Sequence, residues 1–483
     1  MEKDQKIVTR FAPSPTGFMH IGGVRTALFA YLLARKNKGT FLLRIEDTDK
    51  DREVKGSIQH IQDALSWLGI TWDYGPDKPG PFGSCIQSER LASYHEYALK
   101  LIEKGLAYPD PYTPAEVEKF REDAKSAKEP FLYRKHRPAV IEKWDGKKPL
   151  RFKIPEIKRY HWHDVVRGDL EAGEDALDDF IIIKSDGFPT YNFAHIIDDL
   201  NMSVTHILRA DEFISSTPRF LSLYEALKIK PPIFVTLPPI LREDHTKKLG
   251  KRDGAKDVLE YRAEGYLPEA MLNVLALIGW NPGTTKELFT KEELINDFEI
   301  EKIQKSGGSF DEMKLDWFNH QYISKLSDEA FADHASTFLP EWMSTNSPVF
   351  RNSITLIREK ITRFSDITKL FNKDGELAFL KEMPEYEPTM LLWKKEPSAK
   401  TSLNSLEGSL EIVTSVPDNT FTPDAIKVAL WSYAETNGKG NVLWPLRVAL
   451  TGQEKSPDPF VCASLLGKEE TLKRMKNAIS KLS

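Results

Sequence analysis

The segment Ser14-Pro-Thr-Gly-Phe-Met-His-Ile-Gly-Gly23 places a histidine, His20, just before a pair of glycines. A histidine side chain can donate to phosphate oxygens as negative charge develops on them. Gly22 and Gly23 would let a flat base or a ribose approach the backbone, which a Cβ would obstruct. These residue types suit a nucleotide site. A tight turn beside a surface histidine would have the same composition.

The flanking sequence predicts the elements that would position this segment. Residues 7–11 alternate and are rich in β-formers, whereas residues 21–34 carry apolar side chains at helical spacing. A second strand is predicted at 41–45 and a second amphipathic helix at 57–68. This order predicts a parallel βαβ unit, with residues 14–23 at the carboxyl ends of the strands and against a helix N-terminus. Free N–H groups and the helix dipole favour phosphate there.

Length and composition predict a protein of several domains. A chain of 483 residues with 40% hydrophobic and 29% charged residues is typical of a globular protein of about three or more domains. The two cysteines, Cys85 and Cys462, favour a reducing compartment over a disulfide framework. The N-terminus resembles neither a signal peptide nor a transit peptide, and no apolar run could cross a bilayer. We expect a cytoplasmic protein with no membrane partner.

The net charge of −5 neither indicates nor excludes a nucleic-acid partner. A basic excess over the whole chain is the usual signature of such a partner, but phosphate contacts need only a local basic surface. Local basic clusters occur at 134–137 and 473–476, and each alone is more typical of a solvated face.

The strings "FAPSPTGFMHIGGVRTALF" and "RIEDTD" resemble the nucleotide-binding signature of class I aminoacyl-tRNA synthetases, in the form found in the bacterial glutamyl branch. His20-Ile-Gly-Gly23 corresponds to the family's His-Ile-Gly-His element, with glycine in the last place. The resemblance implies that His20, Gly22 and Gly23 bind ATP, and that His20 is catalytic.

A second segment resembles the family's lysine loop. Lys248-Leu-Gly-Lys-Arg252 is similar to Lys-Leu-Ser-Lys-Arg, with glycine in place of serine. Positioned cations stabilise the charge that accumulates when a carboxylate attacks the α-phosphate of ATP. The resemblance therefore implies that Lys248 and Lys251 are catalytic and that both, with Arg252, bind ATP. Alone, such a string is more typical of a solvated charge run.

The same resemblance implies a glutamate site. Two carboxylates favour two guanidiniums, because arginine matches carboxylate geometry with paired hydrogen bonds. Arg10 would hold the side-chain carboxylate, Glu46 would receive the α-ammonium and Tyr191 would donate a hydroxyl. Ser14 and Arg209 complete the implied set. For each residue alone, a salt bridge or a core aromatic is the simpler interpretation, and His195 receives no role.

The implied fold class is α/β: a Rossmann-type parallel-sheet catalytic domain with an α+β insertion, followed by an all-α C-terminal anticodon-binding region. We expect the first nucleotide-binding half at 1–80, an acceptor-end-binding insertion at 81–195, the second half with the lysine loop at 196–254, a stem-contact region at 255–320 and the helical region at 321–483. Helical patterns there span 328–338, 353–371, 400–413, 423–432 and 468–481. Trp431 and Trp444 are candidates for base stacking or, more simply, for core positions.

Many relatives carry a zinc knuckle in the insertion, but the matching stretch, 107–114, lacks cysteines. We therefore predict no structural zinc and no other metal site. The same insertion contains "Arg151-Phe-Lys-Ile" and "His163-Asp-Val-Val-Arg-Gly168", whose apolar and basic residues suit a strand pair that presents cations to a nucleic-acid backbone.

The implied activity is ligation of L-glutamate to glutamate tRNA with ATP and Mg²⁺, by an enzyme expected to be a monomer. Three alternatives remain at this stage. A glutamyl-queuosine-type enzyme would be shorter and lack the helical region. A synthetase-derived binding protein would lack His20, Lys248 and Lys251. A nucleotide-dependent metabolic enzyme would show no salt-sensitive affinity for tRNA.

Overall fold

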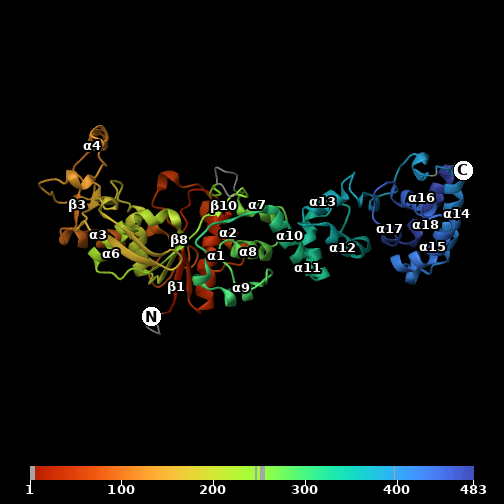
Figure 1. Ribbon diagram of the computed structural model, residues 1–483, viewed down its shortest axis with the longest axis horizontal. Helices are drawn as coiled ribbons and strands as arrows, with labels where there is room; N and C mark the ends of the chain where they lie inside the picture. Colours follow the sequence, from red (N-terminus) through yellow and green to blue (C-terminus); the bar gives the residue numbers. More distant parts are fainter. Residues whose placement is uncertain (1–5, 245–246, 251–255, 396) are drawn as a thin grey trace. The chain divides into compact units, whose positions relative to one another are not determined.

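The computed structural model describes residues 6–244, 247–250, 256–395 and 397–483. The chain divides into two compact units, Met1–Phe318 and Asn319–Ser483, and the division falls within helix α10 (Glu312–Ile323) (Figure 1). None of the helices in these described ranges is long and apolar enough to cross a membrane.

The first unit begins with the expected strand–helix–strand–helix order. It consists of β1 (Val8–Phe11), α1 (Ile21–Lys36), β2 (Thr40–Leu43) and α2 (Ser57–Trp67). β1 and β2 pair in parallel, with Val8 opposite Thr40 and Phe11 opposite Leu43. α1 is buried along most of its length because apolar residues surround it on nearly all sides. The predicted parallel βαβ unit is confirmed.

A second strand–helix–strand unit follows the insertion, and helix α5 (Tyr191–Asn201) precedes it. The unit consists of β8 (His206–Ala210), α6 (Thr217–Leu227) and β9 (Ile233–Leu237), and β8 pairs in parallel with β9. The Thr205 N–H donates to the Val8 carbonyl at 2.9 Å. The Val8 N–H donates to Thr205 Oγ1 at 2.9 Å, so the two halves join beside β1 and β8. The carboxyl ends of these two strands therefore lie together.

Short strands and two helices form the segment between the halves: α3 (Leu91–Glu103), β3 (Ala107–Pro109), α4 (Pro114–Ser126), β4 (Leu150–Phe152), β5 (Tyr160–Asp164), β6 (Gly168–Ala172) and β7 (Phe180–Ile183). β3, β4 and β7 form an antiparallel sheet in that order. The β5–β6 hairpin instead extends the sheet of the second half, in the order β6-β5-β9-β8. Two strands from the expected insertion therefore lie in the nucleotide-fold sheet.

The remainder of the first unit carries three helices and a two-stranded parallel pair: β10 (Ile240–Leu241), α7 (Val258–Ala263), α8 (Pro268–Leu277), α9 (Lys291–Asp297) and β11 (Gly308–Ser309). α8 and α9 pack against α1. They cover the side of α1 that the sheet leaves uncovered, which explains why this helix needs apolar residues all round.

The described residues of the second unit form helices and no strand: α11 (Asp328–Ala335), α12 (Pro348–Lys360), α13 (Asp366–Phe371), α14 (Ala399–Ser415), α15 (Pro423–Asn437), α16 (Lys439–Thr451), α17 (Pro459–Leu466) and α18 (Lys468–Leu482). The expected all-α character is confirmed. The Trp444 indole N–H donates to the Met390 carbonyl at 2.9 Å, and the Trp444 side chain packs against a core cluster. This agrees with the simpler interpretation of Trp444, a core position.

The prediction of one continuous helix at 353–371 is wrong, because a non-helical segment separates α12 from α13. The side chain of Asp366 accepts from the Thr362 N–H at 3.1 Å and from the Arg363 N–H at 3.2 Å. Asp366 lies in the first turn of α13, and its carboxylate holds the segment between the two helices in a non-helical conformation by binding these N–H groups. The pattern also missed α16, which contains Pro445.

Candidate active site

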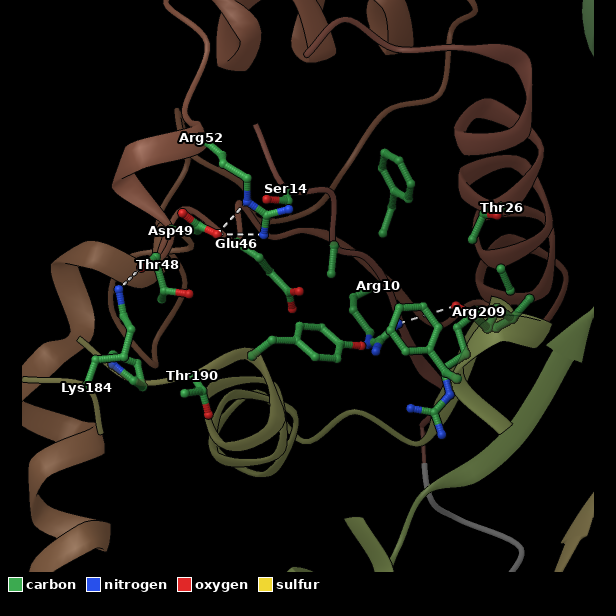
Figure 2. Close-up of a pocket in the computed structure, with 17 residues that line it drawn as sticks. Arg10, Ser14, Thr26, Glu46, Thr48, Asp49, Arg52, Lys184, Thr190 and Arg209 are labelled. Atoms are coloured by element: carbon green, nitrogen blue, oxygen red, sulfur yellow. Dashed lines mark hydrogen bonds and ion pairs between the residues drawn. The ribbon is translucent and has the colours of Figure 1, made fainter. Parts of the chain in front are cut away.

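A cavity of about 510 Å³ opens where the carboxyl ends of β1 and β8 meet (Figure 2). Its lining comes from β1 and the following loop, α1, the segment after β2, the beginning of α5, and β8 with the residues after it: Arg10, Phe11, Ala12, Ser14, Thr26, Glu46, Thr48, Asp49, Arg52, Lys184, Pro189, Thr190, Tyr191, Leu208, Arg209, Ala210 and Phe213. All five residues expected to bind glutamate line this one cavity.

Arg10 is held in place by a buried carboxylate behind the cavity. Its Nε donates to Asp199 Oδ1 at 3.0 Å and its Nη2 to Asp199 Oδ2 at 3.4 Å. Arg44 donates to the same carboxylate at 2.7 Å and to Glu46 Oε1 at 2.9 Å. Burial would raise the pKa of Asp199, but the charges of Arg10 and Arg44 outweigh it and hold the pKa well below its ordinary value.

Asp198 anchors the beginning of α3 to α5. Its carboxylate accepts from Gln87 Nε2 at 2.8 Å, Arg90 Nε at 2.7 Å and the Tyr94 hydroxyl at 2.8 Å. With the neighbouring pairs it forms a buried ionic network of Arg10, Arg44, Glu46, Arg90, Asp198 and Asp199. Positive and negative charges balance within this network, as buried charges require.

Arg209 has no such partner. Its side chain is 7% exposed and packs over the rings of Phe213, Phe220 and Phe234. Nη2 donates to Thr217 Oγ1 at 3.1 Å, whereas Nη1 is buried without a hydrogen-bond partner among the described residues. Burial lowers the pKa of this guanidinium. A buried cation with no carboxylate beside it is costly, and an anionic ligand in the cavity would offset that cost.

The other charged residues of the cavity are paired. Arg52 contacts Asp49 with their closest atoms 2.5 Å apart, and Lys184 Nζ lies 2.7 Å from Asp186 Oδ2. In Figure 2 the carboxylate of Glu46 points toward the middle of the cavity. Burial raises the pKa of Glu46 against the opposing charges of Arg44 and Arg10. Among the described residues that line the cavity, Arg209 is therefore the cation without a paired carboxylate.

Tyr191 begins α5 and lies between the cavity and a buried histidine. Burial raises the pKa of Tyr191 to about 12, so its hydroxyl stays protonated at neutral pH. Its ring stacks on His195 with centroids 4.7 Å apart. His195 Nδ1 lies 2.7 Å from the Tyr191 carbonyl, and burial lowers the pKa of His195 to about 3. His195, which the sequence left without a role, therefore supports Tyr191 as a neutral ring.

His20, Gly22 and Gly23 do not line the cavity. His20 precedes α1, and its Nδ1 accepts from the Gly22 N–H at 3.1 Å. A Cβ on Gly22 would lie 2.9 Å from His20 Cε1, whereas one on Gly23 would meet Met19 and Phe11 only at 3.7 Å. Gly22 thus leaves room for the histidine ring that caps the helix. Of these two glycines, Gly23 is the one whose protein neighbours would leave space for a Cβ.

Of the lysine segment, Lys251 and Arg252 lie outside the described residues. Lys248 is half exposed and forms an ion pair with Glu212. Its backbone bridges that of Leu241 in β10, and the Leu249 N–H donates to the Ile240 carbonyl at 2.8 Å. Lys248 and Leu249 thus pair with β10, which pairs with β11, and neither residue lines the cavity.

The stretch at 107–114 is held by ion pairs and hydrogen bonds. Asp110 accepts from Arg151 Nε at 2.6 Å and from the Tyr133 hydroxyl. Arg151 is buried, so the expectation that it presents a cation to a nucleic-acid backbone is wrong. Within the described ranges, no three His, Cys, Asp or Glu side chains are grouped to hold a metal ion.

Sequence reasoning missed Asp198, Asp199 and Arg44. The available signal was two adjacent acidic residues in an otherwise apolar helix pattern, "NFAHIIDDL". Adjacent carboxylates on the buried side of a helix require buried cations. The sequence alone did not identify which arginines these are.

Comparison with known proteins assigns the chain to a family. Residues 6–317 match the family described as "tRNA synthetases class I (E and Q), catalytic domain", and residues 330–479 match "Anticodon binding domain". Since the first match covers more than half of the chain, this protein belongs to the class I tRNA synthetases of that family. The family expectation and the expected fold class are confirmed.

Its relatives include glutamate–tRNA ligases. That of Clostridium botulinum (strain Hall) is 41% identical over 487 residues, which cover 99% of each chain. The crystal structure of a glutamate tRNA ligase from Elizabethkingia meningosepticum, in complex with its amino acid, matches with a TM-score of 0.88 at 34% identity. A glutamate–tRNA synthetase from Elizabethkingia anophelis matches with a TM-score of 0.85 at 34% identity. Both structural matches cover 99% of this chain and 100% of the other.

Proposed function

We propose that this protein joins L-glutamate to glutamate tRNA in two steps. The α-carboxylate of glutamate attacks the α-phosphate of ATP, which gives glutamyl-adenylate and pyrophosphate. The 2′-hydroxyl of the terminal tRNA adenosine then attacks the acyl carbon and releases AMP. The similarity to glutamate–tRNA ligases over nearly the whole chain supports this function.

The single structural observation that carries the proposal is the uncompensated Arg209. In the part of the chain that the structure describes, the charged residues of the cavity are paired except for this buried guanidinium, and L-glutamate carries a net charge of about −1 at neutral pH. Arg10, already oriented by Asp199, binds the side-chain carboxylate, and Arg209 adds the second guanidinium that two carboxylates favour. Glu46 accepts from the α-ammonium.

Tyr191 and Ser14 provide neutral donors for the same ligand. The Tyr191 hydroxyl is protonated at neutral pH because its pKa is about 12, so it donates without adding charge. A cavity that combines cations with neutral donors discriminates against uncharged amino acids, because Arg209 would remain unpaired beside them.

ATP enters as its magnesium complex and is bound by His20, Gly22, Gly23, Lys248, Lys251 and Arg252. Their cations stabilise the charge that develops on the transferred phosphoryl group and on the departing pyrophosphate. Catalysis consists of positioning and charge stabilisation, without a covalent intermediate on the enzyme. No step requires a structural zinc, and a metal assay showing stoichiometric zinc would contradict that part of the proposal.

The fuller assignment is a cytoplasmic monomer whose helical region binds the anticodon loop. The match of residues 330–479 to an anticodon-binding family supports the anticodon-binding role of the helical region. It also argues against the shorter glutamyl-queuosine-type enzyme. Two buried free cysteines suit a reducing compartment. Light scattering of the purified protein measures the oligomeric state.

Aminoacylation with radiolabelled glutamate, ATP and separately purified glutamate and glutamine tRNAs tests the function. Charging of glutamate tRNA is the expected result, and charging of that tRNA alone would define a discriminating enzyme. Charging of both tRNAs would mean that a second enzyme converts the misacylated product. Tight tRNA binding without charging would favour a binding protein, and no salt-sensitive tRNA affinity would favour a metabolic enzyme.

A further inference from the structure

Helix α2 holds the loop that precedes α1. The Ser57 hydroxyl donates to the Gly17 carbonyl at 2.8 Å, and the Val54 N–H donates to the Pro15 carbonyl at 2.9 Å. Ser57 is fully buried, and His60 lies one turn further along the same face of the helix. The segment that ends in His20 is therefore fixed by contacts with α2 before its own helix begins.

His60 contacts this loop from two directions. Its Nδ1 accepts from the Met19 N–H at 3.4 Å, and the Phe18 ring stacks on the imidazole with centroids 4.7 Å apart. Its Nε2 lies 2.7 Å from both carboxylate oxygens of Asp257. An Nδ1 that accepts requires the proton on Nε2, so Nε2 donates to Asp257. Both nitrogens of the ring are thereby used.

Asp257 follows the lysine segment in the sequence and immediately precedes α7. Its side chain caps α7 by accepting from the Leu259 N–H at 2.9 Å. The N–H of Val258, the residue that follows Asp257, donates to the Met19 carbonyl at 2.9 Å. The backbones of Asp257 and His20 also form a β-bridge. Residues 18–20 and 257–258 are consequently bound both to each other and to His60.

We propose that His60 is a positioning residue for adenylate formation, which fixes the His20 segment relative to the chain that leaves the lysine segment at Asp257. This inference rests on the proposed function. The side chains of His60 and Asp257 are only 11% and 19% exposed, so their contact is shielded from water and stronger than a surface pair. Groups that bind one transition state from two separate segments must be held in register, because small displacements cost rate.

Glutamate-dependent ATP–pyrophosphate exchange with tRNA present, measured for the full chain and its variants, tests this role. His60→Ala is expected to lower kcat/KM for ATP on the order of tenfold and to leave KM for glutamate unchanged. His60→Gln, which places an N–H donor near the Nε2 position, is expected to recover part of the loss. His60→Asn, which retains only an acceptor near Nδ1, is expected to recover less. His163→Ala is the matched control, because His163 lies 2.7 Å from Asp169 but is 69% exposed.

Asp257→Ser separates positioning from helix capping. Serine still caps α7 but cannot reach His60, so this variant is expected to lose as much kcat/KM for ATP as His60→Ala. Combining the two changes should cost little more than either alone, since both remove one contact. If His60→Ala fails to fold, Asp257→Ser and His60→Gln carry the test.

Several outcomes would contradict the inference. A lower thermal unfolding temperature with unchanged ATP kinetics would make the contact merely structural. An equal rise in KM for glutamate would indicate general disruption. An active wild-type protein with unaffected variants would refute this inference alone, whereas a wild-type protein without exchange would refute the proposed function and the inference with it.

Discussion

At the cavity, Arg10, Glu46 and Arg209 are buried, and the first two are held by a charge-balanced network. At the beginning of α1 and in the lysine segment, the proposed nucleotide-binding groups are a helix-capping histidine, glycine backbone and the half-exposed Lys248. On the proposed function, the glutamate end is therefore already held in place by protein contacts. The proposed nucleotide end combines helix-terminal backbone with Lys248, whose ion pair with Glu212 is exposed to solvent.

This difference follows from what each ligand must be distinguished from. Selecting one amino acid requires fixed side chains that leave a wrong ligand with unpaired groups. A triphosphate is recognised by its charge and by backbone N–H groups, which flexible cations and a helix N-terminus supply. Single substitutions at the two ends test this contrast between a rigid end and an adaptable end.

Removal of the unpaired cation should have the largest effect. Arg209→Ala is expected to lower kcat/KM for glutamate by about a hundredfold to a thousandfold, because it removes a desolvated charge that only the ligand compensates. Thermal unfolding should occur at an equal or higher temperature, because the cost of burying a charge with no carboxylate paired to it among the described residues exceeds the gain from its bond to Thr217. Steady-state charging and thermal denaturation measure both. Arg52→Ala, at a paired and exposed arginine of the same cavity, should cost far less.

A large loss of stability in Arg209→Ala with unchanged glutamate kinetics would reverse the contrast. It would mean that Arg209 is a structural residue of the aromatic cluster around Phe220 and that the ligand charge is met elsewhere. Arg209→Lys, which keeps the charge without the paired donors, should fall between the wild type and the alanine variant.

The lysine segment should show the opposite pattern, with loss of rate and no loss of stability. Lys251→Ala and Lys248→Ala are each expected to slow ATP–pyrophosphate exchange on the order of a hundredfold. Lys248→Ala should leave the unfolding temperature unchanged, because an exposed ion pair contributes about 0–1 kcal/mol. Unaltered turnover of Lys251→Ala would remove its assigned role.

Acid should weaken the rigid end through His195. The pKa of this buried ring is about 3, below the ordinary value of about 6.5, so the unfolded chain binds more protons between these pH values. The free energy of unfolding therefore falls as the pH falls, by about 2 kcal/mol between pH 7 and pH 5 from this group alone. In His195→Asn that part of the pH dependence should disappear.

Denaturant unfolding at pH 7 and pH 5 measures the difference. His163→Asn serves as the comparison, since the side chain of His163 is 69% exposed whereas His195 is buried. An identical loss of stability in the wild type and His195→Asn would mean that the pKa of His195 is the same in the folded and the unfolded chain.

The two glycines sharpen the contrast within the nucleotide end itself. Gly22→Ala places a Cβ 2.9 Å from the His20 ring, so it should displace that ring and lower the exchange rate on the order of tenfold. Gly23→Ala meets only ordinary contacts at 3.7 Å within the protein. Any loss in Gly23→Ala without a change in unfolding temperature would point to the bound nucleotide, and equal rates for Gly23→Ala and wild type would argue against close approach there.

Local sequence patterns predicted the parts of the fold that depend on neighbouring residues. The β1–α1–β2–α2 order followed from alternation and helical spacing. The observed first and last residues of these elements differ from the predicted ones by at most two residues. The five cavity residues were found because motif resemblance fixes residue types at set positions. The break at Asp366 was missed because a side chain that binds two backbone N–H groups interrupts a helix without changing its apolar spacing.

The sequence by itself determined which residues could meet glutamate and ATP, since residue types and their spacing limit the chemistry available. Only the tertiary structure decided which charges are already paired. Asp199 joins Arg10 across 189 residues of chain, and Asp257 joins His60 across 197. Such contacts depend on how the two halves pack, and burial then makes each pairing strong or each missing partner costly. That is why Arg10 and Arg209 look alike in the sequence and differ in the folded protein.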